Sequence, residues 1–265
     1  MDTAHLTAYL RRLGVERPAE PTAAALGTLH LAHLHTVPFE NLSVHLGEDI
    51  VLTDEALVAK VTDRQRGGFC YELGGAYAAL LTALGYRVDL LPARVHGAGG
   101  HPGIPYGHLT LRVYGSTGHP WLSDIGFGSL SRHPLDLTAL DTEQADPDGT
   151  FTLTPAADGE LDLVRDGTPQ YRFEPRPRAL GDFRAGAWYH RTHPDSHFTH
   201  SLVCSRLTGT GRLTLSGTTL KETTGTGHTS TELTSDTEVL DCYRTRFNIS
   251  LDRVPQVTPL RPTTA

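Results

Sequence analysis

The chain has 265 residues, 38% of them hydrophobic and 20% charged, which is typical of a folded globular protein. Its net charge of −7 and its lack of a polybasic run provide no electrostatic footprint for nucleic acid or anionic membranes. Because no signal peptide or membrane-length apolar run is evident, we expect a cytoplasmic protein. Its three cysteines, Cys70, Cys204 and Cys242, cannot all pair, so free thiols are expected.

The first third of the chain carries helical patterns. Leu6, Leu10 and Leu13 share one face of a helix predicted over 3–14, with Thr3 as its cap and Gly14 at its end. The pattern predicts three further helices, over 21–35, 53–63 and from Cys70 to about Gly85. Between the second and the third, "TVPFENLSVHLGEDIVL" predicts a loop with strand-like pieces.

The middle third changes to strand periodicity. Short alternating or apolar runs are bounded by Gly and Pro, which predicts an antiparallel barrel or sandwich. The runs are "YRVDLLPARVHG", "GHLTLRVYG", "HPWLSDIGFG", "GTFTLTP", "LDLVRDG" and "QYRFEP". After residue 190, "GRLTLSGTTLKE" predicts a hairpin and "STELTSDTEVLDCYRTRF" a helix. We therefore expect an α+β fold of three packed parts, over 1–90, 91–190 and 191–265.

Cys70 follows a double glycine and begins a predicted helix. A helix N-terminus carries partial positive charge and unpaired N–H groups, which favour a thiolate and an oxyanion. Gly67 and Gly68 permit a tight approach that a Cβ would block. On this residue alone, a buried structural cysteine is the favoured alternative.

A nucleophilic cysteine needs a base and a group that orients the base. The predicted strand "GHLTLRVY" offers His108, and the next one, "HPWLSDIG", offers Asp124. If Tyr114 pairs with Gly118 in a hairpin, His108 and Asp124 become direct cross-strand neighbours. A register shifted by one residue places Asp124 on the opposite face, and the sequence does not choose between the two.

Five segments together resemble the arylamine N-acetyltransferases. They are "VPFENLSVH" (37–45), "RGGFCYE" (66–72), "GHLTLRV" (107–113), "DIGFG" (124–128) and "THPDSHF" (192–198). The resemblance implies an N-terminal helical bundle, an antiparallel β-barrel and a C-terminal α/β lid, with a cysteine-protease-like catalytic core. In this arrangement the first part carries the nucleophile, and the second carries the His and the Asp.

The resemblance also implies the chemistry. Cys70 is then the nucleophile, His108 the base and Asp124 the orienting acid. Acetyl-CoA is the donor, and an aromatic amine, hydrazine or N-hydroxyarylamine is the acceptor, without a metal. Aromatic positions that line the family's acceptor pocket are matched by Phe39, Phe127 and Phe198, for which core packing is the alternative. No residue is assigned to CoA binding.

Other functions compete with this one. A polyketide amide synthase shares the triad but takes its acyl group from a carrier protein. A hydrolytic cysteine enzyme would have to admit water to an aromatic pocket. A zinc module would use the histidines of "HRTHPDSHFTH", although Pro194 interrupts any helix there. A non-catalytic binding protein would leave Cys70 no more reactive than the other two thiols.

Overall fold

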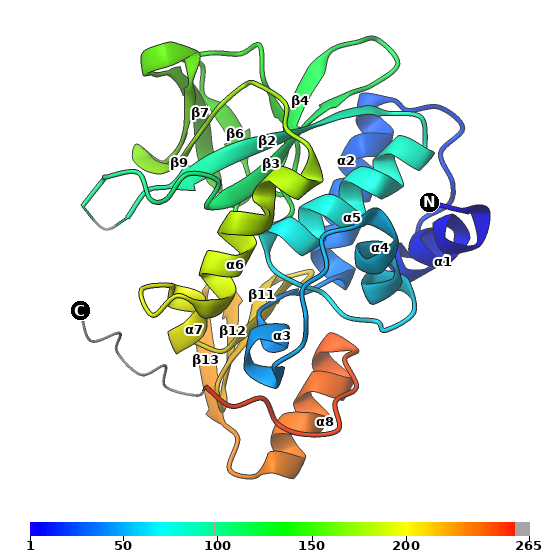
Figure 1. Cartoon of the computed structure of the whole chain (residues 1–265), viewed down its shortest axis with the longest axis vertical. Helices are drawn as coiled ribbons and strands as arrows, with labels where there is room; N and C mark the ends of the chain where they lie inside the picture. The colour runs from blue at the N-terminus through cyan, green and yellow to red at the C-terminus, as the bar shows by residue number, and fades with distance from the viewer. Residues whose placement is uncertain (98, 258–265) are drawn as a thin grey trace.

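A computed structural model describes residues 1–97 and 99–257 of the chain. Five helices precede the first long strand (Figure 1). They are α1 (Thr3–Leu13), α2 (Ala23–Thr36), α3 (Leu42–Leu46), α4 (Asp54–Thr62) and α5 (Cys70–Ala83). No helix in these ranges is long and apolar enough to cross a membrane, and a cytoplasmic location stays a prediction.

Local capping explains where these helices begin. The carboxylate of Asp2, not Thr3, caps α1 by accepting from the N–H of His5 at 2.8 Å, and left-handed Gly14 ends that helix. Thr22 caps α2, so this helix begins two residues after Pro21. Thr53 caps α4 as predicted. The loop expected over 36–52 contains the short helix α3, which was not predicted.

The middle of the chain forms an antiparallel sheet that curls into a nearly closed barrel (Figure 1). Its order is β5-β4-β3-β2-β9-β8-β7-β6. The strands are β2 (Arg87–Val95), β3 (His108–Tyr114), β4 (Pro120–Ser123), β5 (Leu135–Asp136), β6 (Gln144–Asp146), β7 (Gly149–Pro155), β8 (Leu161–Arg165) and β9 (Thr168–Phe173). Apolar residues of these strands form a buried cluster that includes Leu91, Phe151 and Tyr171.

A second antiparallel sheet has the order β1-β10-β11-β12-β13. Its strands are β1 (Phe39–Glu40), β10 (Val203–Leu207), β11 (Gly211–Ser216), β12 (Thr219–Thr224) and β13 (Gly227–Glu232). Helix α8 (Asp236–Phe247) packs on this sheet through Val239, Tyr243 and Phe247. The prediction that this helix begins at residue 230 was therefore wrong, because residues 227–232 form the strand β13, which pairs with β12.

Helices α6 (Arg184–Thr192) and α7 (His197–His200) connect the two sheets, and short 3-10 turns lie at Ala157–Gly159 and Leu180–Phe183. Phe183 and Ala187 join the buried cluster of the N-terminal helices. Strand β1, in turn, belongs to the C-terminal sheet. Apolar packing therefore crosses residues 90 and 190, and the three-part division at those positions stays a prediction.

The register of β3 and β4 differs from the hairpin considered from sequence. Tyr114 pairs with Pro120, not Gly118, and Leu111 pairs with Ser123. The turn is two residues longer than the one considered, so Asp124 continues the register opposite Thr110. The shift is even, which keeps the side chains of Asp124 and His108 on the same face of the sheet.

Candidate active site

Cys70 begins α5 and is 3% exposed. The chain reaches it through two glycines that lie against neighbouring atoms. A Cβ on Gly67 would lie 1.8 Å from the carbonyl oxygen of Pro38, and one on Gly68 would lie 2.6 Å from Cβ of Glu72. Both glycines are thus required by close approach, as the sequence suggested. They bring the start of a 14-residue helix against β1 with no room for side chains.

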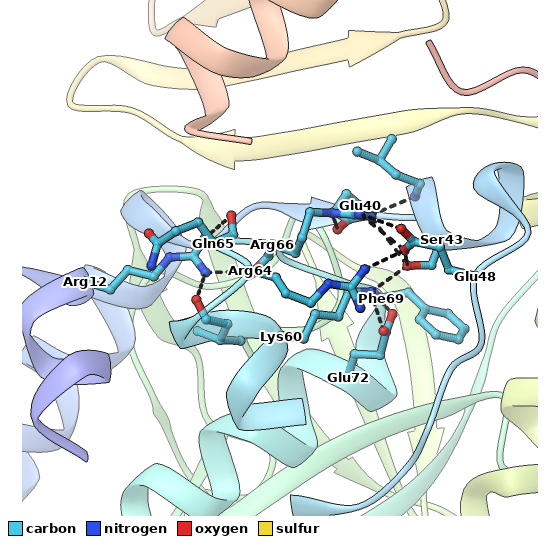
Figure 2. Close-up of polar contacts among 12 residues, drawn as sticks. Arg12, Glu40, Ser43, Glu48, Lys60, Arg64, Gln65, Arg66, Phe69 and Glu72 are labelled. Carbon is cyan, nitrogen blue, oxygen red and sulfur yellow. Dashed lines mark hydrogen bonds and ion pairs between the residues drawn. The ribbon is translucent and has the colours of Figure 1, made fainter. Parts of the chain in front are cut away.

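A buried ionic network supports this approach segment (Figure 2). Arg66 donates to both carboxylate oxygens of Glu40, at 2.9 and 3.2 Å. Lys60 pairs with Glu72 at 2.5 Å and also donates to Ser43 Oγ at 2.8 Å. The other oxygen of Glu72 accepts from the N–H of Phe69 at 3.3 Å, which satisfies the start of α5. Cys70 therefore stands on a segment fixed by charged groups from α4 and β1.

The imidazole of His108, at the start of β3, reaches the carboxylate of Asp124, just after β4. Nε2 of His108 donates to Oδ2 of Asp124 at 2.6 Å, and the two residues are 2% and 4% exposed. The other carboxylate oxygen accepts from the N–H of Gly126 at 3.0 Å. With Nε2 engaged, Nδ1 is the nitrogen that is left for a reaction partner.

The opposite charges of His108 and Asp124 shift the pKa values of both side chains. Burial opposes the imidazolium, but the Asp124 carboxylate, its hydrogen bond and an interaction with the Cys70 side chain together raise the pKa of His108 to about 10. Burial likewise opposes the carboxylate, while the charge of His108 and its hydrogen bond lower the pKa of Asp124. The resting site is therefore an imidazolium held by a carboxylate. An adjacent imidazolium also favours the thiolate form of a cysteine.

Gly126 lies directly against the backbone and side chain of Cys70. A Cβ on this residue would lie 2.9 Å from Cα of Cys70 and 3.3 Å from its Cβ. The segment that follows Asp124 therefore packs directly against Cys70. The structure brings together Cys70, His108 and Asp124, the three residues that the sequence nominated, in one buried site.

Two groups of aromatic residues lie near this centre. Phe127 meets the His108 ring edge to face, with centroids 5.3 Å apart. Phe198 lies 5.8 Å from Phe69, the residue before Cys70, and 6.0 Å from Phe39. The three predicted pocket residues are half-buried and pack against the two buried clusters. Their role as a pocket stays a prediction.

Tyr171 of β9 was not nominated from the sequence. Its ring packs on His108 at 5.1 Å and on Phe127 at 5.4 Å. Its hydroxyl donates to Thr110 Oγ1 at 3.3 Å. Only the pairing of β9 with β2 brings Tyr171 here, and "QYRFEP" carries no local signal of that pairing.

The histidine cluster considered for zinc is dispersed. His190 Nε2 donates to the Gly107 carbonyl at 2.9 Å, and burial lowers its pKa more than this hydrogen bond raises it. His193 stacks on Tyr189, while His200 contacts the Pro194 carbonyl. Within residues 1–97 and 99–257, no group of three or more His, Cys, Asp or Glu side chains is arranged to hold a metal ion.

Comparisons with known proteins assign the family. Residues 22–257 match the N-acetyltransferase family. The arylamine N-acetyltransferase of Mycolicibacterium smegmatis is 33% identical over 254 residues, covering 93% of this chain and 92% of the relative. This chain belongs to the arylamine N-acetyltransferase family. The "Arylamine N-acetyltransferase / N-hydroxyarylamine O-acetyltransferase" of Salmonella typhimurium is 34% identical over 219 residues, which are 80% of this chain and 77% of the relative.

Solved arylamine N-acetyltransferase structures share the fold. The Mycobacterium marinum enzyme superposes with a TM-score of 0.84 at 34% identity, over 92% of each chain. A structure of the M. marinum enzyme in complex with CoA gives a TM-score of 0.83 at 32% identity, also over 92% of each chain. The α+β architecture predicted from the sequence is therefore confirmed, and the chain is an enzyme of the arylamine N-acetyltransferase family.

Proposed function

We propose that Cys70 carries an acetyl group from acetyl-CoA to an aromatic amine, with His108 moving the protons. The observation that carries this proposal is the 2.6 Å contact between His108 and Asp124, buried together with the thiol. The contact commits Nε2 to the carboxylate, so we assign Nδ1 to proton transfer with Cys70, as general acid–base catalysis at a nucleophile requires.

In the first half-reaction, the Cys70 thiolate attacks the thioester carbonyl, and the start of α5 faces the developing oxyanion. The carbon–sulfur bond to CoA then breaks. The departing CoA thiolate takes the proton from Nδ1 of His108, and acetyl-Cys70 remains. His108 is now neutral, and its Nε2–H stays bound to Asp124.

In the second half-reaction, the nitrogen of an aromatic amine attacks acetyl-Cys70. Nδ1 of His108 takes the proton that the nitrogen loses. The carbon–sulfur bond to Cys70 breaks, which restores the thiolate and the imidazolium. Aromatic amines suit this step because their low basicity leaves the nitrogen unprotonated at neutral pH. The same route accepts aromatic hydrazines and N-hydroxyarylamines.

The acceptor is proposed to lie among Phe39, Phe127 and Phe198. Phe127 borders the base, and Phe198 borders the residue before the nucleophile, so an aromatic ring held between them presents its nitrogen to acetyl-Cys70. Stacked or edge-to-face aromatic contacts contribute about 0.5–1.5 kcal/mol each beyond area burial. Replacing Phe198 by Ala is therefore expected to raise KM for the amine more than it lowers kcat.

Steady-state kinetics test this proposal. With acetyl-CoA and a panel of aryl amines varied together and CoA release as the signal, a ping-pong enzyme gives parallel double-reciprocal lines. Cys242→Ala serves as the matched thiol control and should retain activity, whereas Cys70→Ala should not. Intersecting lines would contradict the acyl-enzyme. Transfer only from an acyl group on a carrier protein, with acetyl-CoA inert, would favour the amide synthase.

A further inference from the structure

A basic cavity lies between three helix C-termini, apart from the catalytic residues. Its volume is about 440 Å³, and it is lined by four arginines, two on α1, one on β10 and one on α8. The four are Arg11, Arg12, Arg206 and Arg246. No aspartate or glutamate is among its lining residues. We call this site the arginine cavity.

Backbone carbonyls fix two of these guanidinium groups without neutralising them. Arg12 donates to the carbonyl of Arg66 at 2.7 Å and to that of Gln65 at 3.2 Å (Figure 2). Arg206 donates to the carbonyls of Arg246 at 2.8 Å and His35 at 3.1 Å. A carbonyl orients a guanidinium but carries no net charge. Both groups are therefore preorganised and still positively charged.

The charge of the cavity is only partly balanced. Within residues 1–97 and 99–257, Arg11, Arg12 and Arg206 have no carboxylate at ion-pair distance, while Arg246 pairs with Glu222. The C-termini of α1, α2 and α8 each contribute about half a negative charge. Together with Glu222, they leave more than one positive charge uncompensated.

Burial lowers the pKa values of two arginines of the cavity. Burial lowers the pKa of Arg12 to about 10, so it is still charged at neutral pH. Burial and then the neighbouring charge of Arg246 lower the pKa of Arg206. Nε of Arg12 is buried without a hydrogen-bond partner in the described part of the chain. An anion in the cavity would relieve the repulsion between these cationic groups.

Two residues with left-handed backbone conformation line the arginine cavity. Gln65 and Asn248 both line the cavity, both have positive φ angles of 51° and 56°, and the Asn248 amide donates to the Gln65 side chain at 3.3 Å. Left-handed asparagine is common after a helix, as here after α8, but left-handed glutamine is uncommon. The turn at Gln65 aims its carbonyl at Arg12. Local strain of this kind persists where surrounding structure enforces it.

We propose that the arginine cavity binds a small, multiply charged oxyanion of the phosphate class, about the size of pyrophosphate. Four arginines line a hollow of about 440 Å³, and guanidinium groups recognise phosphate oxygens through paired N–H donors. The source of the diphosphate is either the CoA donor or a separate phosphorylated ligand. The binding site itself does not depend on the reaction proposed above.

Isothermal titration of the full-length chain with inorganic pyrophosphate at low salt tests this proposal. Arg11→Glu reverses a charge that has no described polar partner, so it should leave the fold intact, which thermal unfolding without anion would verify. Arg244→Glu is the matched control, because Arg244 lies on α8, is exposed, pairs with Asp241 and does not line the cavity. We expect Arg11→Glu to weaken binding at least about tenfold and Arg244→Glu less than about twofold.

Absence of binding to the wild-type chain overturns the proposal, as does equal weakening in the two variants, which indicates only a general surface attraction. Acetyl transfer distinguishes the source. If pyrophosphate competes with acetyl-CoA and Arg11→Glu abolishes that competition, the cavity receives the donor's diphosphate. If pyrophosphate binds without competing, the ligand is a separate one. A chain inactive with every amine still gives an interpretable titration.

Discussion

His108 and Asp124 form their 2.6 Å hydrogen bond diagonally across the β3–β4 pair, since the register places Asp124 opposite Thr110. Diagonal neighbours on one face are about 7–8 Å apart at the backbone, within reach of an imidazole and a carboxylate. Asp124 also lies one residue beyond β4, where its second oxygen accepts from Gly126. The position of the His108 imidazole thus depends on both the strand and the turn that follows it.

Replacing Asp124 by Asn should remove the charge that holds the imidazolium while it preserves shape. Burial then dominates, and the pKa of His108 should fall from about 10 to below its ordinary 6.5. We expect kcat to drop roughly 10³- to 10⁴-fold, as in other triads that lose this charge. NMR titration of the His108 ring would measure the pKa. Asp136→Asn, which breaks a more exposed pair with His119, should leave both quantities unchanged.

The same pair predicts a pH dependence of stability. The folded-state pKa of His108 lies above the unfolded value, so its stabilisation is complete below pH 6.5 and is lost as pH rises through about 10. The pKa of Asp124 is lowered, so its stabilisation is present above pH 3.8 and is lost as pH falls through the folded-state pKa. The pair therefore stabilises the fold most between pH 3.8 and pH 6.5, where both contributions are complete.

Urea unfolding of the wild type and Asp124→Asn at several pH values would measure this effect. The gap in their free energies of unfolding should narrow between pH 6.5 and 10, by at most about 1.4 kcal/mol per pH unit. A gap that is constant over this range would show that the two groups are not ionised together in the folded protein.

Gly126→Ala should impair catalysis with the triad residues all present. Its Cβ would lie 2.9 Å from Cα of Cys70, so Cys70 or the Asp124 turn must move. A displacement of about 1 Å can reduce a rate about 100-fold. Gly181→Ala is the control, because no atom lies within 4 Å of its added Cβ. Single-turnover rates for the two variants should therefore differ about 100-fold. Similar rates would mean that the packing against Cys70 tolerates an added methyl group.

Lys60→Met should destabilise the fold strongly. It leaves Glu72, 4% exposed, as an unpaired buried carboxylate, which typically costs about 3–5 kcal/mol. The double variant Lys60→Met with Glu72→Gln should recover part of this loss. Arg64→Met breaks a more exposed pair with Glu48 and should cost less than about 1 kcal/mol. Chemical denaturation of the four proteins would measure these differences, and equal losses in Lys60→Met and Arg64→Met would contradict the account.

Features that depend on neighbouring residues could be predicted from the sequence. Thr53 and Gly14 cap their helices where expected, because capping acts within one helical turn. The strand β1 was not predicted as a sheet member, since its partner Ser205 lies 166 residues later in the chain than Phe39. Strand β13 was partly mistaken for a helix, because all six of its residues are exposed and carry no apolar alternation.

The site shows the same division. Cys70, His108 and Asp124 stand in short motifs that point to one chemistry, and the structure brings them together. The β3–β4 register could not be predicted, because the sequence between the two strands is compatible with turns of different lengths. Lys60 reaches Glu72 from the preceding helix, 12 residues earlier, and Tyr171 reaches His108 from a strand that comes later in the chain, so no pattern within one element indicated either contact.

Intact-protein mass spectrometry after brief exposure to acetyl-CoA detects the proposed acyl-enzyme itself. We expect a single acetyl group, placed on Cys70 by peptide mapping, absent from Cys70→Ala, and removed when an aryl amine is added. Cys204 and Cys242 should remain unmodified, because burial raises the pKa of both thiols. An adduct that persists in Cys70→Ala, or none in the wild type while amine acetylation proceeds, would contradict a Cys70 acyl-enzyme.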